Sequence, residues 1–207
     1  MPPGPIFRTD FFARGCLEVA PDLVGAYLVR RIDARTRLVG RIVEVEAYLG
    51  DGSDPGSHAH RGPTPRNRAM FGPPGRLYVY RSYGIHICAN VVCGPDGSAA
   101  AVLLRAFEPV EGVECMRNRR GLAPGAPAHA IASGPGKLAQ ALDLTLEDYC
   151  RSLLRGTLRL QRPGRDDPPP AIATSPRIGL SRGADLPYRF YDTGSRCVSR
   201  APRSRRR

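Results

Sequence analysis

The sequence is almost free of lysine. Of its 31 basic residues, Lys137 is the only lysine and the other 30 are arginine. Two explanations stay open for this bias. A GC-rich genome favours arginine codons, and selection for phosphate binding favours the guanidinium group, which can donate two parallel hydrogen bonds.

Long apolar runs are also missing. No stretch approaches the roughly 20 apolar residues that a membrane-spanning helix needs. The first residues, Met1-Pro2-Pro3-Gly4-Pro5, have neither the charged start nor the apolar centre of a signal peptide. We therefore expect a cytoplasmic protein without a membrane partner.

Cysteine pairs of the C-x-x-C type are absent. The six cysteines are scattered, at Cys16, Cys88, Cys93, Cys115, Cys150 and Cys197. In a cytoplasmic chain such cysteines are typical of small buried apolar residues or exposed thiols, not of a disulfide framework. The same scatter argues against a zinc or iron–sulfur site, so we predict no metal.

Acidic residues are too few to balance the basic ones. The chain has 207 residues, and its 31 Lys and Arg against 19 Asp and Glu give a net charge of +12. This excess favours a polyanion as partner, although it also aids solubility. Residues 200–207 are rich in arginine, and their only apolar residues are Ala201 and Pro202. We expect one domain over residues 1–200 and a basic, disordered tail over 201–207.

The apolar pattern predicts a mostly β chain up to residue 107. We expect strands over 26–32, 38–48, 76–80, 85–92 and 99–107, with a hairpin joining the first two. Helices are expected from Phe11 under an Asp10 cap, and over 21–24, 111–119 and 136–142. Short late strands are expected over 157–161, 177–180 and 188–192. This order predicts an α+β fold around a predominantly antiparallel sheet.

The run Arg41-Ile42-Val43-Glu44-Val45-Glu46-Ala47-Tyr48 carries the strongest chemical signal. In a strand, side chains two positions apart share a face. Alternation therefore places Val43, Val45 and Ala47 on a core face and turns Glu44, Glu46 and Tyr48 to the other. Unpaired carboxylates are costly in a core, which makes the second face a candidate site.

Two further segments support a site for nucleic acid. The first, Thr64-Pro65-Arg66-Asn67-Arg68, closes a Gly- and Pro-rich loop over residues 49–66, and such long loops are more often functional than idle. The second, Tyr78-Val79-Tyr80-Arg81-Ser82-Tyr83, combines aromatic rings with arginine. A carboxylate, stacking rings and arginine clusters together indicate water-activating chemistry on a nucleic-acid base.

Several linked motifs occur in an order that is similar to a known family. They are Val45-Glu46-Ala47-Tyr48-Leu49-Gly50, Ser57-His58-Ala59, Thr64-Pro65-Arg66-Asn67-Arg68, Met70-Phe71, Leu77-Tyr78-Val79-Tyr80, Tyr83-Gly84, Leu103-Leu104-Arg105-Ala106 and Ser133-Gly134-Pro135. With them the chain resembles the alkyladenine (3-methyladenine) DNA glycosylases. The resemblance implies hydrolysis of the N-glycosidic bond of alkylated or deaminated purines in duplex DNA, without a metal or organic cofactor. It also implies one mixed domain similar to the C-terminal domain of methionyl-tRNA formyltransferase.

The resemblance also implies roles for individual residues. Glu46 matches the family's catalytic glutamate, and Arg105 matches an arginine that holds the water and backbone region beside it. Residues that match the walls of the base pocket are Tyr48, His58, Tyr80 and Asn90. Because the segment Ser57-His58-Ala59-His60-Arg61-Gly62 offers two histidines, His60 stays open as an alternative to His58.

Contacts to the rest of the DNA are expected outside the pocket. Tyr83, at the expected hairpin tip, matches a tyrosine that the family inserts into the minor groove. The candidate phosphate contacts are Arg66, Arg68, Arg76, Arg81 and Lys137. We expect a monomer, associated with the nucleoid if the source is bacterial.

Two rival functions remain at this stage. A bifunctional glycosylase/lyase would use an amine, and Pro2 would be an N-terminal amine once Met1 is removed; however, Pro3 stands where such enzymes carry an acidic residue. A non-catalytic nucleic-acid module of the formyltransferase-tail type would explain charge and fold. It gives no reason for Glu46 or Tyr83, so we favour a monofunctional glycosylase.

Overall fold

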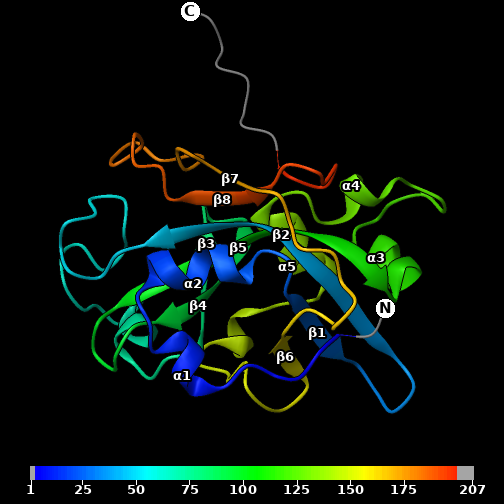
Figure 1. The fold of residues 1–207 in the computed structure, drawn as a ribbon, viewed down its shortest axis with the longest axis horizontal. Coiled ribbons are helices and arrows are strands. Elements are labelled where there is room, and N and C mark those ends of the chain that lie inside the picture. Colours follow the sequence, from blue (N-terminus) through cyan, green and yellow to red (C-terminus); the bar gives the residue numbers. More distant parts are fainter. Residues whose placement is uncertain (1–2, 200–207) are drawn as a thin grey trace, which may run out of the picture.

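An antiparallel sheet of eight strands organises the computed structural model, which describes residues 3–199 (Figure 1). The strands are β1 (Tyr27–Arg31), β2 (Arg37–Tyr48), β3 (Leu77–Ser82), β4 (His86–Cys93), β5 (Ala100–Glu111), β6 (Leu158–Gln161), β7 (Ile172–Ser175) and β8 (Arg189–Asp192). Their order is β3-β4-β5-β2-β1-β6, and β8 pairs with both β2 and β7. The α+β class is confirmed. The tail expected over 201–207 lies outside the described residues.

Short helices surround this sheet. They are α1 (Thr9–Phe12), α2 (Cys16–Leu23), α3 (Val113–Arg119), α4 (Ala128–Ala132) and α5 (Pro135–Ala141), with 3-10 turns η1 (Arg68–Phe71) and η2 (Leu146–Asp148). Within residues 3–199, no helix is long and apolar enough to cross a membrane.

The main core lies on the face of the sheet that the helices cover. Helix α2 packs on β2 and β5, and α5 packs on β4 and β5. Strand β2 contributes Ile42, Val45 and Ala47 to this core, and β5 contributes Leu104. Full burial of such apolar side chains stabilises the fold by roughly 1.5–3 kcal/mol for the larger ones. The opposite face is therefore free to carry polar side chains.

A bulge interrupts the pairing of β2 with β5. The pairs around it are Ile42 with Phe107, Glu44 with Ala106, and Val45 with Leu104. Val43 on β2 and Arg105 on β5 are thus extra residues without a partner in the register. Bulges re-aim side chains and often lie beside functional sites. Here the bulge brings Arg105 beside the carboxylates of β2.

The bulge also corrects one prediction from the sequence. Simple alternation put Val43 on the same core face as Val45 and Ala47. Instead, Val43 packs against Ala106 and Cys197 in a separate small cluster, while Val45 and Ala47 lie in the main core. The extra residue shifts the two-residue periodicity of β2 by one position. The sequence alone does not predict this shift.

Most expected elements are confirmed with shifted ends. The expected strands of the first half correspond to β1–β5, and the late strands over 157–161 and 188–192 correspond to β6 and β8. Strand β5 continues to Glu111, so the helix expected from 111 begins only at Val113, after Gly112 with φ of 71°. Helix α2 is longer than the single turn expected over 21–24, and α4 was not expected.

Two local predictions are wrong. Residues 177–180 form no strand; the late strand is β7, because the Arg177 side chain is drawn inward to the Asp54 carboxylate and the Ala47 carbonyl. Asp10 does not cap the first helix from outside. The helix already includes Thr9, its N-cap is Arg8, and the Asp10 carboxylate accepts the neighbouring Phe11 amide.

Candidate active site

Glu46 lies on the polar face of the sheet with no exposed surface. Its Oε1 accepts the Ile178 amide at 2.7 Å, and its Oε2 accepts the Tyr48 hydroxyl at 2.9 Å. The Arg105 Nη1 forms an ion pair with Oε2 at 3.1 Å. An ionised carboxylate has about four acceptor sites. Oε1 has a single donor among these contacts and Oε2 has two, so one acceptor position of Oε1 has no protein partner among them.

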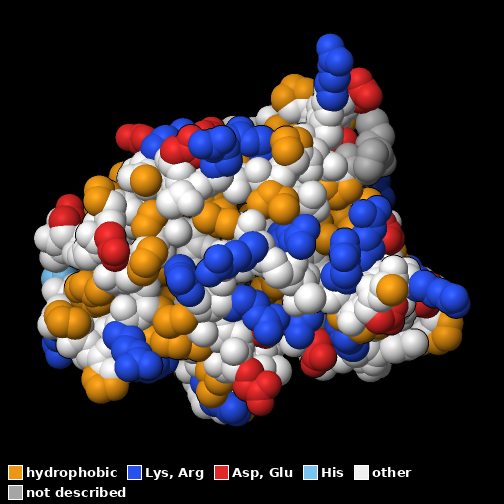
Figure 2. Space-filling view, turned by 90° about the horizontal axis from the view of Figure 1, so that it is seen from below, with side chains coloured by type: hydrophobic (Ala, Val, Ile, Leu, Met, Phe, Trp, Pro, Cys, Tyr) orange, Lys and Arg blue, Asp and Glu red, His pale blue; other side chains and the backbone are white. Residues whose placement is uncertain are grey.

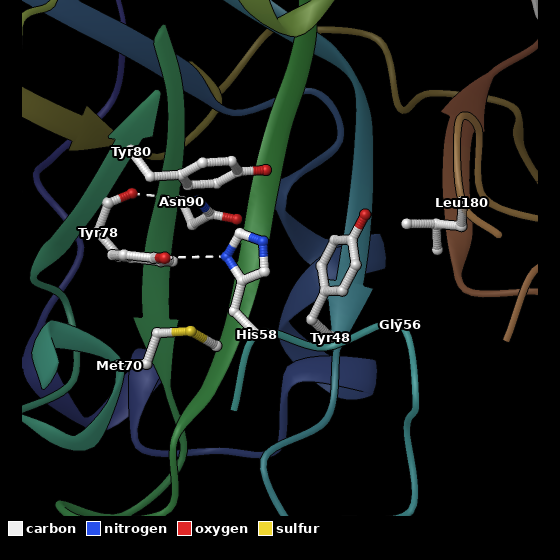
Figure 3. Close-up of a pocket in the computed structure, with 8 residues that line it drawn as sticks. All are labelled: Tyr48, Gly56, His58, Met70, Tyr78, Tyr80, Asn90 and Leu180. Carbon is white, nitrogen blue, oxygen red and sulfur yellow. Dashed lines mark hydrogen bonds between the residues drawn. The ribbon is translucent and has the colours of Figure 1, made fainter. Parts of the chain in front are cut away.

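A hollow lined by aromatic rings opens beside this carboxylate. Its lining residues are Tyr48, Gly56, His58, Met70, Tyr78, Tyr80, Asn90 and Leu180 (Figure 3). The hollow has about 320 Å³ of empty space, including its open mouth. Tyr48 belongs to both features, because its ring lines the hollow while its hydroxyl binds Glu46. Burial and the Glu46 charge raise the pKa of Tyr48 well above its usual value, so the phenol remains a donor.

Three rings are packed together on one side of the hollow. Tyr78 stacks on Tyr80 with ring centroids 5.3 Å apart, and His58 meets Tyr80 edge-on at 4.5 Å. The His58 Nδ1 is 2.9 Å from the Tyr78 hydroxyl. Partial burial of the imidazole and the nearby Arg66 charge lower the pKa of His58. The imidazole is therefore neutral at pH 7.

The two candidate histidines differ in their position relative to the hollow. His58 lines the hollow, and its ring points into it between Tyr80 and Tyr48 (Figure 3). His60 is not a lining residue; its Nδ1 is buried without a hydrogen-bond partner.

Asn90 reaches the hollow from β4. Its amide nitrogen donates to the Tyr78 carbonyl at 3.1 Å, and the side-chain oxygen is turned toward the hollow (Figure 3). Buried polar groups are costly unless they are partnered. The bond to Tyr78 therefore holds an acceptor at the wall of the hollow.

A second buried carboxylate, Glu44, was noticed in the sequence but was given no role. Its oxygens accept four donors: Arg105 Nε at 2.8 Å, Arg189 Nε at 2.7 Å, Ser199 Oγ at 2.7 Å and the Ser199 amide at 2.5 Å. Burial alone would raise the pKa of Glu44, but the charges of Arg105 and Arg189 outweigh it and lower the pKa. Glu44 is therefore ionised, with three donors on Oε1 and one on Oε2.

The buried ion pair between Asp54 and Arg177 was not predicted from the sequence. Both side chains are fully buried and joined by two hydrogen bonds, at 2.6 and 2.7 Å. The guanidinium carbon of Arg177 lies 4.5 Å from the centre of the Tyr48 ring, and its Nη1 donates to the Ala47 carbonyl. The pair ties the loop after β2 to the segment before β8, behind the Tyr48 ring. Asp54 lies in a Gly- and Pro-rich loop, so no local pattern identifies it.

Tyr83 lies at the tip of the β3–β4 hairpin, as expected. It is 83% exposed, and its backbone is in the left-handed region with φ of 48°. Its hydroxyl donates to the Gly179 carbonyl at 3.3 Å. The neighbouring Ile85 is also 71% exposed. The hairpin therefore presents two large apolar side chains to solvent.

The expected phosphate contacts do not form one group. Arg66, Arg68 and Arg81 line a common groove at the edge of β3, together with Tyr80 and Tyr149. Arg66 is partly engaged, since it donates to the Arg81 carbonyl at 3.0 Å and its guanidinium lies 5.4 Å from the Tyr80 ring centre.

The remaining two candidates lie elsewhere. Arg76 is half-buried and donates to the Cys150 carbonyl at 2.9 Å. Lys137 is exposed on α5. Figure 2 shows that Lys and Arg side chains outnumber Asp and Glu on the face seen there. Within the part of the chain that the structure describes, no group of three or more His, Cys, Asp or Glu is arranged to hold a metal ion.

Known proteins match nearly the whole chain. The family model for methylpurine-DNA glycosylase matches residues 10–196. A protein of Rhodopseudomonas palustris, named "Putative 3-methyladenine DNA glycosylase", is 49% identical over 95% of this chain and 89% of its own length. Proteins of the same name from Methanoculleus marisnigri and Chlorobaculum parvum are each 49% identical over 92% of this chain, covering 96% and 88% of their own lengths. The chain therefore belongs to the methylpurine-DNA glycosylase family, whose members are DNA-repair hydrolases acting on N-glycosyl bonds.

Proposed function

We propose that this protein is a monofunctional DNA glycosylase that removes alkylated or deaminated purines, of the 3-methyladenine and hypoxanthine type, from duplex DNA. The observation that carries the proposal is the hydrogen bond between Tyr48 and Glu46. It joins a hollow lined by aromatic rings to a buried carboxylate whose Oε1 has a single protein donor. The protein would act as a monomer in the cytoplasm, and it would begin base excision repair.

In the proposed chemical step, Glu46 activates the attacking water. The carboxylate accepts a proton from the water, the water oxygen attacks the sugar C1′, and the C1′–N bond breaks with its electron pair passing to the purine. General-base catalysis of this kind contributes about 10²–10⁴-fold. A purine methylated at N3 is cationic and leaves as a neutral base, whereas hypoxanthine must be protonated as it leaves. Arg105 would fix the orientation of the Glu46 carboxylate.

The hollow would receive the base after it has left the duplex. Extrusion of a nucleotide costs a few kcal/mol of stacking and pairing, and each aromatic ring that stacks on a base contributes roughly 1–3 kcal/mol. Tyr48 and Tyr80, with His58 between them, supply such surfaces. The side-chain oxygen of Asn90 would face the edge of the bound base. It would accept a hydrogen bond from a donor group of the base only where the geometry of the lesion allows one.

The hairpin tip would fill the gap that the extruded base leaves. Tyr83 is exposed at that tip, and apolar side chains that insert between base steps are a known device for distorting DNA. Beside it, the DNA backbone would be bound by Arg66, Arg68 and Arg81. Such phosphate contacts set the register of the protein on the duplex and not its sequence preference. Arg76 and Lys137 are the remaining candidates for phosphate contacts.

Release of free base from duplex oligonucleotides tests the proposal. Duplexes that contain hypoxanthine, and methylated DNA that contains 3-methyladenine, should yield free purine and an intact abasic strand. An undamaged duplex of the same sequence is the matched control. Binding without release of a purine would favour the non-catalytic module. Strand cleavage without added alkali or heat would favour a glycosylase/lyase.

A further inference from the structure

The two carboxylates of β2 differ in how completely they are occupied. Glu44 accepts four hydrogen bonds, from Arg105, Arg189 and twice from Ser199. Three of these bonds fall on Oε1 and one on Oε2. Glu46 is approached by three donors, from Ile178, Tyr48 and Arg105, and one of them, Tyr48, lines the hollow. The donors of Glu44 do not line the hollow, so Glu44, although it is as deeply buried as Glu46, is linked to the hollow only through Arg105 and Glu46.

One guanidinium group connects the two carboxylates. Arg105 donates through Nε to Glu44 at 2.8 Å, and its Nη1 lies 3.1 Å from Glu46. Its third nitrogen, Nη2, donates to the Ser199 hydroxyl at 3.2 Å. Since a guanidinium is planar and rigid, these contacts fix the plane of the group. Arg105 also occupies the bulge position on β5, where register pairing alone does not set its direction.

Strand β8 and the segment after it complete the assembly from the far end of the chain. Arg189 donates through Nε to Glu44 at 2.7 Å and through Nη2 to the Ser199 carbonyl at 3.0 Å. The Ser199 hydroxyl donates to Glu44 and accepts from Arg105. Glu44 is the one group that all three of these residues bind. The cluster contains two carboxylates and two guanidinium groups, so its charges balance.

We propose that Glu44 is a positioning residue for base excision, which holds Arg105 away from full pairing with Glu46 and so keeps an acceptor site of Glu46 open to water. This inference rests on the proposed glycosylase function. Without Glu44, both nitrogens of the Arg105 fork would be free to turn to Glu46, because a bidentate pair with a carboxylate is the geometry that guanidinium favours. Both of these nitrogens would then occupy the Glu46 oxygens, and no acceptor site would be left for water.

The test is single-turnover excision by Glu44→Gln at saturating enzyme, measured across pH. The charged or titratable groups that face the two carboxylates are Arg105, Arg189, Tyr48, Arg177, Tyr80 and Cys88. We expect the maximal rate to fall by roughly ten- to hundredfold, as for other misplaced catalytic groups, while lesion affinity stays within about twofold. The acid limb of the rate profile should move to lower pH, because two guanidinium charges then stabilise one carboxylate.

The matched control is Asp192→Asn. Asp192 is a buried carboxylate on the same strand as Arg189, but its partners are Arg41 and the amides of Ala171 and Gly194. This variant should be less stable than wild type and yet keep the wild-type rate and pH profile per active molecule, with active molecules counted by titration with lesion DNA. It separates loss of a buried ion pair from loss of positioning.

Ser199→Ala keeps the inference testable if Glu44→Gln does not fold. It removes the hydroxyl between Glu44 and Arg105 and keeps the amide. Excision should slow by about tenfold, because the lost hydroxyl is hydrogen-bonded to two charged groups, Glu44 and Arg105. If wild type excises and these variants match its maximal rate and acid limb, the positioning role is wrong. If wild type itself releases no base, the proposed function fails instead.

Discussion

The Tyr48 hydroxyl donates to the Glu46 carboxylate across 2.9 Å, and the same ring lines the hollow. The two residues are neighbours on one face of β2, so the strand itself sets their separation. A base that stacks on Tyr48 would therefore lie at a fixed distance from the carboxylate. The first prediction removes this link and leaves the ring.

Tyr48→Phe should reduce the single-turnover rate of excision by about tenfold or more, because a hydrogen bond to a charged group contributes roughly 1.5–3 kcal/mol. Lesion affinity should change little, since the stacking surface remains. The control is Tyr27→Phe, which alters a buried tyrosine on β1, away from the hollow. Equal rates in Tyr48→Phe and wild type would show that the Tyr48–Glu46 bond has no part in the chemistry.

Asp54→Asn should destabilise the protein strongly. Breaking a fully buried ion pair by removing one partner costs about 3–5 kcal/mol, which in a chain of this size lowers Tm on the order of 10 °C. Lesion affinity should also fall, because Arg177 packs on the Tyr48 ring. Calorimetry would measure the first effect and duplex titration the second.

Asp22→Asn is the matched control for Asp54→Asn. Asp22 pairs with Arg14 at 2.9 Å, but both side chains are substantially exposed, and exposed pairs contribute about 0–1 kcal/mol. Its Tm should stay close to that of wild type. Similar Tm values for the two variants would contradict the account of the Asp54–Arg177 pair.

Tyr83→Ala should weaken capture of the extruded base and leave the chemical groups in place. We expect the largest loss of excision on well-paired lesions and the smallest on mispaired ones, because extrusion already costs less there. Because Tyr83 is exposed, its loss should not change Tm appreciably. Kinetics on one lesion opposite several bases would measure the effect. A uniform loss across all pairings would indicate a surface role.

Borohydride should trap no covalent adduct between enzyme and DNA during excision. A lyase needs a nucleophilic amine that forms a Schiff base with the sugar. Lys137 is the only lysine in the chain; it is exposed on α5 and does not line the hollow. Denaturing electrophoresis of the trapped reaction is the measurement. An adduct that disappears in Lys137→Ala, or after the N-terminus is blocked, would overturn the monofunctional assignment.

The sequence predicted which local residues come together around the hollow and Arg105. Strand alternation predicted that Glu44, Glu46 and Tyr48 share a face, and all three take part in the contacts around Arg105 or the hollow. The family motifs identified His58, Tyr80 and Asn90, which line that hollow. These residues lie in or beside elements whose apolar pattern is strong.

The features of the site that the sequence did not predict depend on contacts between distant segments of the chain. Glu44 meets Arg189 and Ser199 from 145 and 155 positions away, and Asp54 meets Arg177 from 123. No short-range pattern carries such pairings. The bulge at Val43 was missed for a related reason, since it depends on how β5 pairs with β2.

Excision by Glu46→Gln tests the central claim most directly. The substitution keeps shape and removes basicity, so the variant should fold and bind lesion DNA with an affinity close to that of wild type. At saturating enzyme, its single-turnover rate on a hypoxanthine duplex should be lower by at least about 10²-fold, the lower range expected for a positioned general base. A rate within tenfold of wild type, with lesion binding intact, would contradict the assignment of the water-activating carboxylate to Glu46.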